Sequence, residues 1–96
     1  MNKADFFKQG VCETKAYEMP DGAEITIVGL TVAQRGKMRD AVAKDSVKGQ
    51  ALVVCMACTD LDEGDIASVM EMDGGLIQSI SDAVLEMSGL ISKAKN

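Results

Sequence analysis

Hydrophobic and polar positions follow three patterns along the chain, and the first of them alternates. Between residues 11 and 30, two stretches of strand character, VCETKAYEM and AEITIVGL, flank the tripeptide Pro-Asp-Gly at 20–22. Proline fixes the first corner of a turn and glycine accepts a positive φ, so this segment predicts a β-hairpin. In its second strand, Ile25 and Ile27 lie on the same face.

A helical period begins at Thr31. Thr31 and Gln34 match a capping box, in which the threonine hydroxyl accepts from the third backbone N–H and the glutamine reaches back to the cap. We expect a helix from there to about residue 45. Its expected apolar stripe contains Val32, Met38, Ala41 and Val42, and its expected wet side contains Arg35, Lys37, Arg39 and Lys44.

The next segment, from Val47 or Gly49 to Thr59, is apolar on every side and predicts a second helix. A helix of this kind either lies at the centre of a core or offers its second face to a partner. The run ALVVCMAC within it also fits a buried strand, because periodicity alone does not separate the two.

The last part of the chain predicts two further helices. After an acidic loop at residues 60–65, a short helix runs from Asp65 as N-cap to Met70, and a break follows at residues 73–75. The final helix, at residues 76–87, has the clearest stripe, and Gly89 stands where a C′ glycine closes a helix. The stripe consists of Leu76, Ile77, Ile80, Ala83, Val84 and Met87.

These elements predict one α+β domain over residues 11–91, in which an N-terminal β-hairpin packs on a bundle of three to four α-helices. A chain of 96 residues suffices for one modest core. We expect residues 1–10 to form an N-terminal arm, either docked through Phe6 and Phe7 or mobile. Residues 92–96 form a short basic tail.

The amino-acid composition excludes several classes of functional site and partner. The chain has no histidine and no tryptophan, which excludes histidine relays and histidine-ligated zinc. Its net charge is −5, with +1 in residues 1–48 and −6 in residues 49–96, so we expect no nucleic-acid partner. No segment reaches the ~18–20 apolar residues of a membrane span, and no signal peptide precedes the three cysteines. We therefore expect a cytoplasmic protein with reduced thiols that binds no membrane.

Three motifs resemble functional sites but lack features that those sites require. Cys55 and Cys58 form a CxxC pair, but they lie in mid-run between apolar residues and lack two further zinc ligands, so burial in the core is the favoured interpretation. The acidic loop places Gly64 one position too early for a calcium-binding EF-hand. Asp73-Gly74-Gly75 lacks the lysine of a phosphate loop. We expect no catalytic residue, no metal and no cofactor.

Methionine is the unusual component, with seven residues against three aromatic ones. Met38, Met56, Met70, Met72 and Met87 lie in the helical part. Such side chains either fill an aromatic-poor core, which is their commoner use, or form an adaptable surface for helical partners.

The order of these elements resembles the tail assembly chaperones of long-tailed, non-contractile phages, over about residues 15–90. The resemblance is carried by the following features: the helix start Thr31-Val32-Ala33-Gln34-Arg35, an Ala/Val/Cys helix, the acidic loop Asp60–Asp65, a short helix, and the ending Leu85-Glu86-Met87-Ser88-Gly89-Leu90. Relatives often have an acidic residue where this chain has Gln34, and a more aromatic loop.

The resemblance implies a non-enzymatic chaperone of virion morphogenesis in the cytoplasm of a bacterial host, encoded by a phage or prophage and absent from the mature virion. Its partners would be the tape measure protein, which many self-associating copies coat, and the tail tube protein. Such chaperones are often made in two lengths by a −1 frameshift, and Ala94-Lys95-Asn96 is compatible with the slippery heptamer A AAA AAC.

As partner-binding residues we expect Arg35 and Arg39 on the first long helix, with Met70 and Met72 after it. Two other hypotheses stay open. One is a small phage or bacterial regulatory module that binds one globular protein at fixed stoichiometry. The other is a redox or metal-binding domain that uses Cys55 and Cys58.

Overall fold

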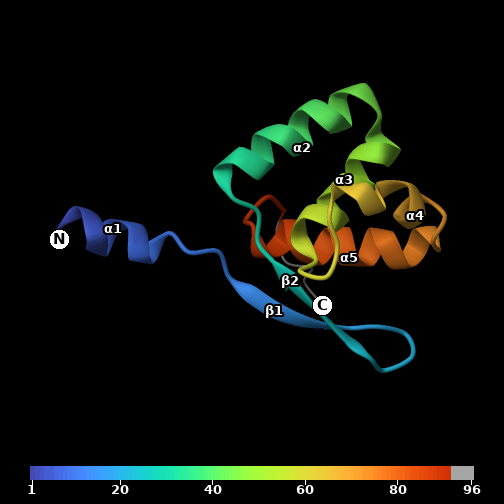
Figure 1. The fold of residues 1–96 in the computed structure, drawn as a ribbon, viewed down its shortest axis with the longest axis horizontal. Coiled ribbons are helices and arrows are strands. Elements are labelled where there is room, and N and C mark those ends of the chain that lie inside the picture. Colours follow the sequence, from blue (N-terminus) through green and yellow to red (C-terminus); the bar gives the residue numbers. More distant parts are fainter. Residues whose placement is uncertain (92–96) are drawn as a thin grey trace.

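The computed structural model describes residues 1–91 and confirms the α+β fold (Figure 1). A two-stranded antiparallel hairpin is followed, within these residues, by four α-helices and one 3-10 turn. The elements are α1 (Lys3–Gln9), β1 (Thr14–Glu18), β2 (Glu24–Val28), α2 (Val32–Lys44), α3 (Ser46–Ala57), η1 (Glu63–Asp65), α4 (Ile66–Met70) and α5 (Gly74–Met87).

The hairpin forms as predicted. β1 and β2 pair from Thr14 opposite Val28 to Glu18 opposite Glu24, and Gly22 turns the chain with φ +90°. β2 is the inner strand, because the fully buried Ile27 forms an isolated bridge with Cys58 at the end of α3. This bridge joins the hairpin to the helices.

Helix α3 is the centre of the core and confirms the helical alternative for its segment. α2, α4 and α5 all contact it. Its buried residues cover every side of the helix: Gly49, Ala51, Leu52, Val53, Val54, Cys55 and Ala57. Val47, in its first turn, is 61% exposed and lines a small hollow beside Met70 and Met72 instead of the core.

The predicted capping box starts α2. Gln34 N donates to Thr31 Oγ1 over 3.1 Å, and Thr31 N donates to Gln34 Oε1 over 2.9 Å. The expected stripe is only partly correct, because α2 has no buried residue and Val32 and Val42 are exposed. Among the apolar side chains of α2, Met38 is the one that packs against the core.

Helices α2 and α3 approach closely at Gly49. A Cβ there would lie 2.8 Å from the Cα of Val42 and 2.9 Å from its backbone nitrogen. Asp45 joins the two helices, and its carboxylate accepts from the backbone N–H groups of Val47 and Lys48. The tight connection therefore depends on a residue without a side chain.

Helix α5 covers α3 with its buried face, which includes Ile77, Ile80 and Val84. It begins two residues before the predicted start, because the Asp73 carboxylate accepts from Leu76 N. It ends in the predicted Schellman closure: Gly89 has φ +74°, and Leu90 N donates to Leu85 O over 2.8 Å. The short α4 has its predicted bounds.

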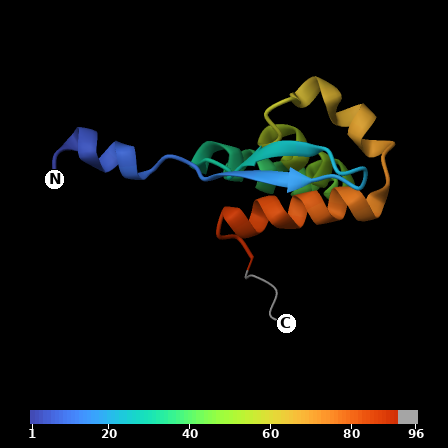
Figure 2. The same cartoon turned by 90° about the horizontal axis from the view of Figure 1, so that it is seen from below.

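Residues 3–9 form a helix that the sequence analysis did not predict. Asn2 and Asp5 make a reciprocal capping box, and α1 has no buried residue. Figures 1 and 2 show α1 projecting away from the other elements, so the interpretation of an arm docked on its own domain is wrong. The predicted basic tail at residues 92–96, with Ala94, Lys95 and Asn96, lies outside the described residues.

Candidate protein-binding surface

An apolar pocket of about 230 Å³ opens between the hairpin, the η1–α4 segment and α5. Buried side chains, among them Val69 and Ile80, form its floor. Met19, Leu61 and Met72 also line it, and we call it the methionine pocket. Its lining is almost wholly apolar, which is typical of a site that takes apolar side chains from a partner.

Each of these three residues is fixed by a backbone hydrogen bond at the end of an element. Met19 N donates to Ala23 O over 2.7 Å in the hairpin turn. Leu61 N donates to Cys58 O over 3.1 Å after α3, and Met72 N donates to Val69 O over 3.0 Å after α4. The backbone is thus held while the long side chains keep their rotamer freedom.

Carboxylates give the pocket a negative edge. Asp60 and Asp65 both line it, and Asp65 is held in place because its carboxylate accepts from Asp62 N over 2.9 Å. Asp62 in turn accepts from Gly64 N over 2.8 Å. The acidic loop therefore presents fixed negative charge beside an apolar cavity.

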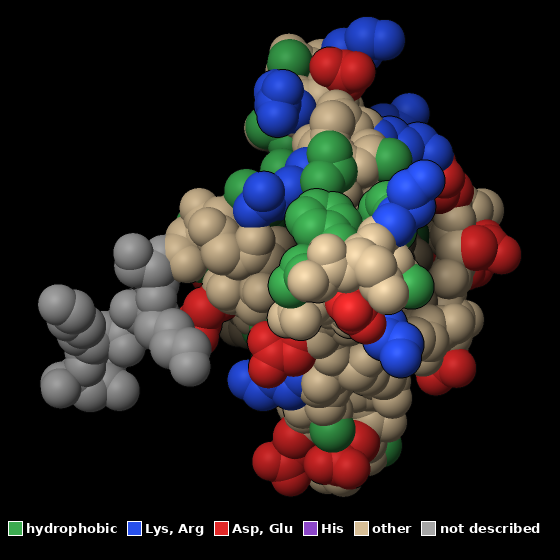
Figure 3. Space-filling model, turned by 90° about the vertical axis from the view of Figure 1, so that its left-hand side faces the viewer, with side chains coloured by type: hydrophobic (Ala, Val, Ile, Leu, Met, Phe, Trp, Pro, Cys, Tyr) green, Lys and Arg blue, Asp and Glu red, His purple; other side chains and the backbone are tan. Residues whose placement is uncertain are grey.

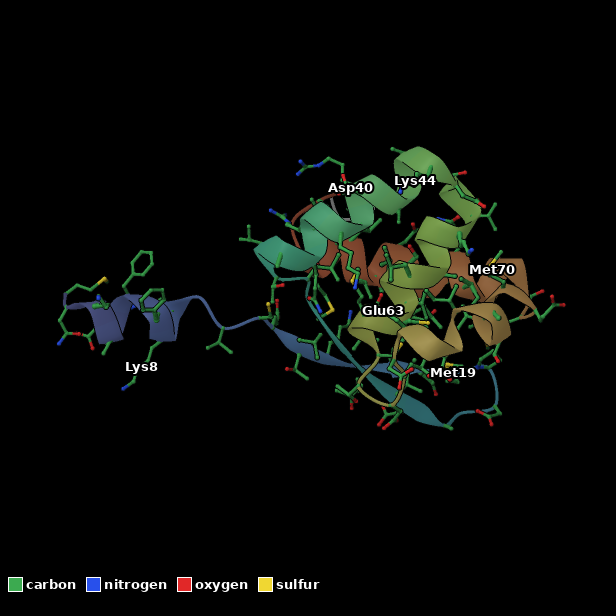
Figure 4. All side chains as sticks on the ribbon, turned by 45° about the horizontal axis from the view of Figure 1, so that its top comes forward. Lys8, Met19, Asp40, Lys44, Glu63 and Met70 are labelled. Carbon is green, nitrogen blue, oxygen red and sulfur yellow. The ribbon has the colours of Figure 1, made fainter. Side chains whose placement is uncertain are left out.

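Met72 connects the pocket to a second apolar area. It also lines a small hollow of about 70 Å³ together with Val47 and Met70. Met70 is 42% exposed and Met72 is 43% exposed, which leaves their thioethers accessible to a partner. Figure 4 shows Met70 far from Lys8 of α1, on the opposite side of the molecule.

A larger hollow of about 570 Å³ lies on the other side of Met19, between the hairpin turn and the start of α5. It is wide open, and polar residues such as Glu18, Asp73 and Ser79 share its lining with apolar ones. The smaller methionine pocket is the stronger candidate, because apolar enclosure provides binding energy that an open polar groove does not.

The two predicted arginines lie elsewhere. Arg35 is half-buried, and its Nη2 donates to Ser88 O over 2.5 Å, so it is not on the wet side of its helix as expected. Its buried Nε has no hydrogen-bond partner within residues 1–91. Arg35 therefore ties α2 to the C-terminal end of α5.

Arg39 is exposed, as predicted, on α2. The arginines and the methionines nevertheless do not come together. Arg35 contacts the C-terminal cap of α5, whereas Met70 and Met72 lie near its N-terminus, and this helix of 14 residues is about 21 Å long. The four predicted residues thus belong to two separate places.

Sequence reasoning missed Met19, Asp60 and Leu61 as pocket residues. Met19 stands beside the Pro-Asp-Gly turn, and it reaches the pocket because the hairpin folds over the helices. No local pattern signals this long-range approach. The sequence predicts the acidic loop at residues 60–65 but gives no sign that it borders a pocket.

Cys55 and Cys58 are buried, which supports the core interpretation. Burial, followed by the charges of Asp65, Asp62 and Glu63, raises the pKa of Cys55. Burial, followed by Cys55 and Asp60, raises the pKa of Cys58 to about 11. Both thiols are protonated at neutral pH, which disfavours redox chemistry. Within residues 1–91 no cluster of cysteine and carboxylate side chains has the arrangement of a metal site.

Basic side chains gather over α2. In Figure 3 the blue Lys and Arg side chains are concentrated in the upper part of the face and the red Asp and Glu side chains in the lower part. Lys37 pairs with Glu63 across this division. The acidic loop, which borders the methionine pocket through Asp60 and Asp65, therefore lies beside the basic helix at Glu63.

No protein-family profile, curated protein or solved structure matches this chain. Among residues 1–91, no helix combines the length and the apolar character that crossing a membrane requires.

Proposed function

We propose that this protein is a non-enzymatic chaperone that holds apolar segments of a helical partner in its methionine pocket. The observation that supports this most directly is the pocket itself, an apolar cavity bordered by flexible side chains and open to solvent. The resemblance to tail assembly chaperones names the partners: a phage tape measure protein, and the tail tube protein that replaces the chaperone.

Methionine suits a client with many different binding segments. Its unbranched thioether side chain adapts to side chains of different shape, and each contact contributes modestly. Many copies along one long helical protein add these weak contacts into strong binding by avidity. Weak single contacts also allow the copies to leave when tube subunits arrive.

The negative edge adds selectivity. Asp60 and Asp65 favour client segments in which a Lys or Arg flanks the apolar anchor. The overall charge of −5 disfavours nucleic acid, which such a protein meets in the bacterial cytoplasm where virions are assembled. A protein with this role leaves the tail before the virion is complete.

The test is co-expression with fragments of a tape measure protein encoded beside this gene. We expect complexes with several copies of this chain per fragment, and more copies on longer fragments, measured by native mass spectrometry. Met72→Glu places a charge in the pocket and should reduce binding more than tenfold. Val32→Glu introduces the same charge at a residue that is 86% exposed on α2, and should leave binding unchanged.

The alternative, a small regulatory module, gives a different result. Such a protein would ignore these fragments and bind one globular protein at a fixed one-to-one ratio. Complexes of constant stoichiometry on fragments of every length would contradict the chaperone proposal. Equal losses from Met72→Glu and Val32→Glu would remove the methionine pocket as the site.

A further inference from the structure

Helix α1 carries apolar surface that its own chain does not cover. Phe6 and Phe7, the two phenylalanines of the sequence, are 63% and 65% exposed. Their rings contact each other edge to face, with centroids 5.4 Å apart. Figure 2 shows α1 extended from the rest of the molecule. Aromatic side chains exposed in this way are typical anchors of protein interfaces.

Two lysines flank this aromatic pair, while the one carboxylate of α1, Asp5, is engaged in the cap with Asn2. Lys3 lies one helical turn before Phe6 and Phe7, and Lys8 follows them directly. The same chain contains the matching counterpart, because Asp60 and Asp65 border the methionine pocket. The chain therefore carries an apolar anchor with lysine neighbours and, on a distant part of its surface, an apolar pocket with carboxylate neighbours, and the two are complementary in charge.

Helix α1 lies far from the methionine pocket of its own molecule. α1 joins β1 at Thr14, whereas Met19 marks the opposite end of that strand, about 17 Å further on at the usual rise per residue. α1 also points away from the hairpin and the helices in both ribbon views (Figures 1 and 2). In this structure α1 therefore lies away from its own pocket and is exposed to a neighbouring molecule.

We propose that α1 of one copy inserts Phe6 and Phe7 into the methionine pocket of a second copy. Donor and acceptor are different surfaces, so the contact is heterologous and each added copy offers a free pocket or a free α1. Two phenylalanines bury about 150–250 Å² each, well under the area of a stable interface. Association is therefore weak, reversible and dependent on concentration.

This contact also masks the pocket before a client arrives. A client segment and α1 compete for the same apolar site, so free copies cover one another's pockets. The competition rests on the proposed function, whereas the contact between copies does not. Loss of α1 contacts then strengthens client binding and abolishes self-association, two effects that are measured separately.

The experiment is sedimentation equilibrium of the full chain over a hundredfold range of concentration. The wild type should rise above the monomer mass of 10.2 kDa as concentration increases. Phe6→Ala/Phe7→Ala, which lacks the anchor, and Met72→Glu, which lacks a usable pocket, should each stay monomeric. Val32→Ala removes another exposed apolar side chain and should behave as the wild type.

Mixing the two monomeric variants is the decisive step. Phe6→Ala/Phe7→Ala keeps the pocket, and Met72→Glu keeps α1, so the mixture should form a heterodimer that does not grow further. A wild type that is monomeric at every concentration would overturn the proposal. Continued association of either variant alone would also overturn it. A mixture that stays monomeric would overturn it too, because it would indicate contact between like surfaces. Circular dichroism establishes that each variant is folded.

Discussion

Helices α3 and α1 both carry prominent apolar side chains, but the burial of these side chains differs completely. Seven residues of α3 are buried by its own chain, whereas α1 has none buried despite its two phenylalanines. The contrast shows that apolar content alone does not assign a segment to the core. The apolar side chains of α3 are mostly covered by the fold, whereas those of α1 and the side chains of Met70 and Met72 remain exposed.

The largest expected effect on the free energy of unfolding comes from a residue in the buried core. Ile80, which is almost fully buried, lies on the face of α5 that packs against α3. Ile80→Ala should lower the free energy of unfolding by about 2–5 kcal/mol through lost burial and a cavity. Phe6→Ala/Phe7→Ala removes more apolar surface, yet at low concentration should change it by less than about 0.5 kcal/mol. Urea unfolding measures both, and similar losses would mean that α1 belongs to the core.

Substitution of two glycines by alanine distinguishes the effect of close helix packing from that of helix propensity. Gly49→Ala places a Cβ against the backbone of Val42 and should destabilise the protein by about 1–3 kcal/mol. Gly36→Ala is the matched control in α2, where nothing lies within 4 Å of an added Cβ, and should stabilise it by about 0.5–1 kcal/mol. The measurement is again urea unfolding. Stabilisation by both variants would show that α2 and α3 do not pack closely.

The hydroxyl of Ser88 ties the hairpin side to α5. Its Oγ accepts from Leu30 N over 2.8 Å and donates to Val84 O over 2.7 Å. Ser88→Ala leaves the Leu30 N–H without this acceptor and should cost about 1–3 kcal/mol. Ser79→Ala, on the exposed side of the same helix, should cost nothing measurable in thermal unfolding. Equal melting temperatures for the two variants would show that the Ser88 hydrogen bonds do not stabilise the fold.

The smallest effect appears only at alkaline pH. The pKa of Cys58 is raised from its ordinary value of 9.0 to about 11, so folding favours the protonated thiol. Its contribution is complete below pH 9 and is lost as the pH rises through 11. Unfolding in urea at intervals from pH 7 to 11, with reductant, should show this decline. Cys58→Ala should flatten the curve, and an unchanged slope would exclude Cys58 as the cause.

Local rules predicted most of the fold. The Pro-Asp-Gly turn, the capping box of Thr31 and the C′ glycine at Gly89 each act within a few residues, so sequence alone revealed them. The capping box of α1 was equally local and was overlooked, because a seven-residue helix with no buried face has no hydrophobic period.

The candidate binding surface was much harder to predict. Met19 and Met72 are 53 positions apart and meet only because the hairpin folds over the helices. Arg35 looked like a free surface charge, since the Ser88 carbonyl that it contacts is also 53 positions away. Met70 and Met72 were identified by composition, which records the residue type and not its neighbours.

Methyl NMR of ¹³C-methionine-labelled protein is the sharpest test of the claim that the methionine pocket binds helical partners. The seven methionines give separate probes within one spectrum. Titration with a tape measure fragment should shift the methyl signals of Met19 and Met72 and leave that of Met56, in α3, unchanged. Shifts at Met56 without shifts at Met19 and Met72, or no shifts at saturating fragment, would contradict the claim.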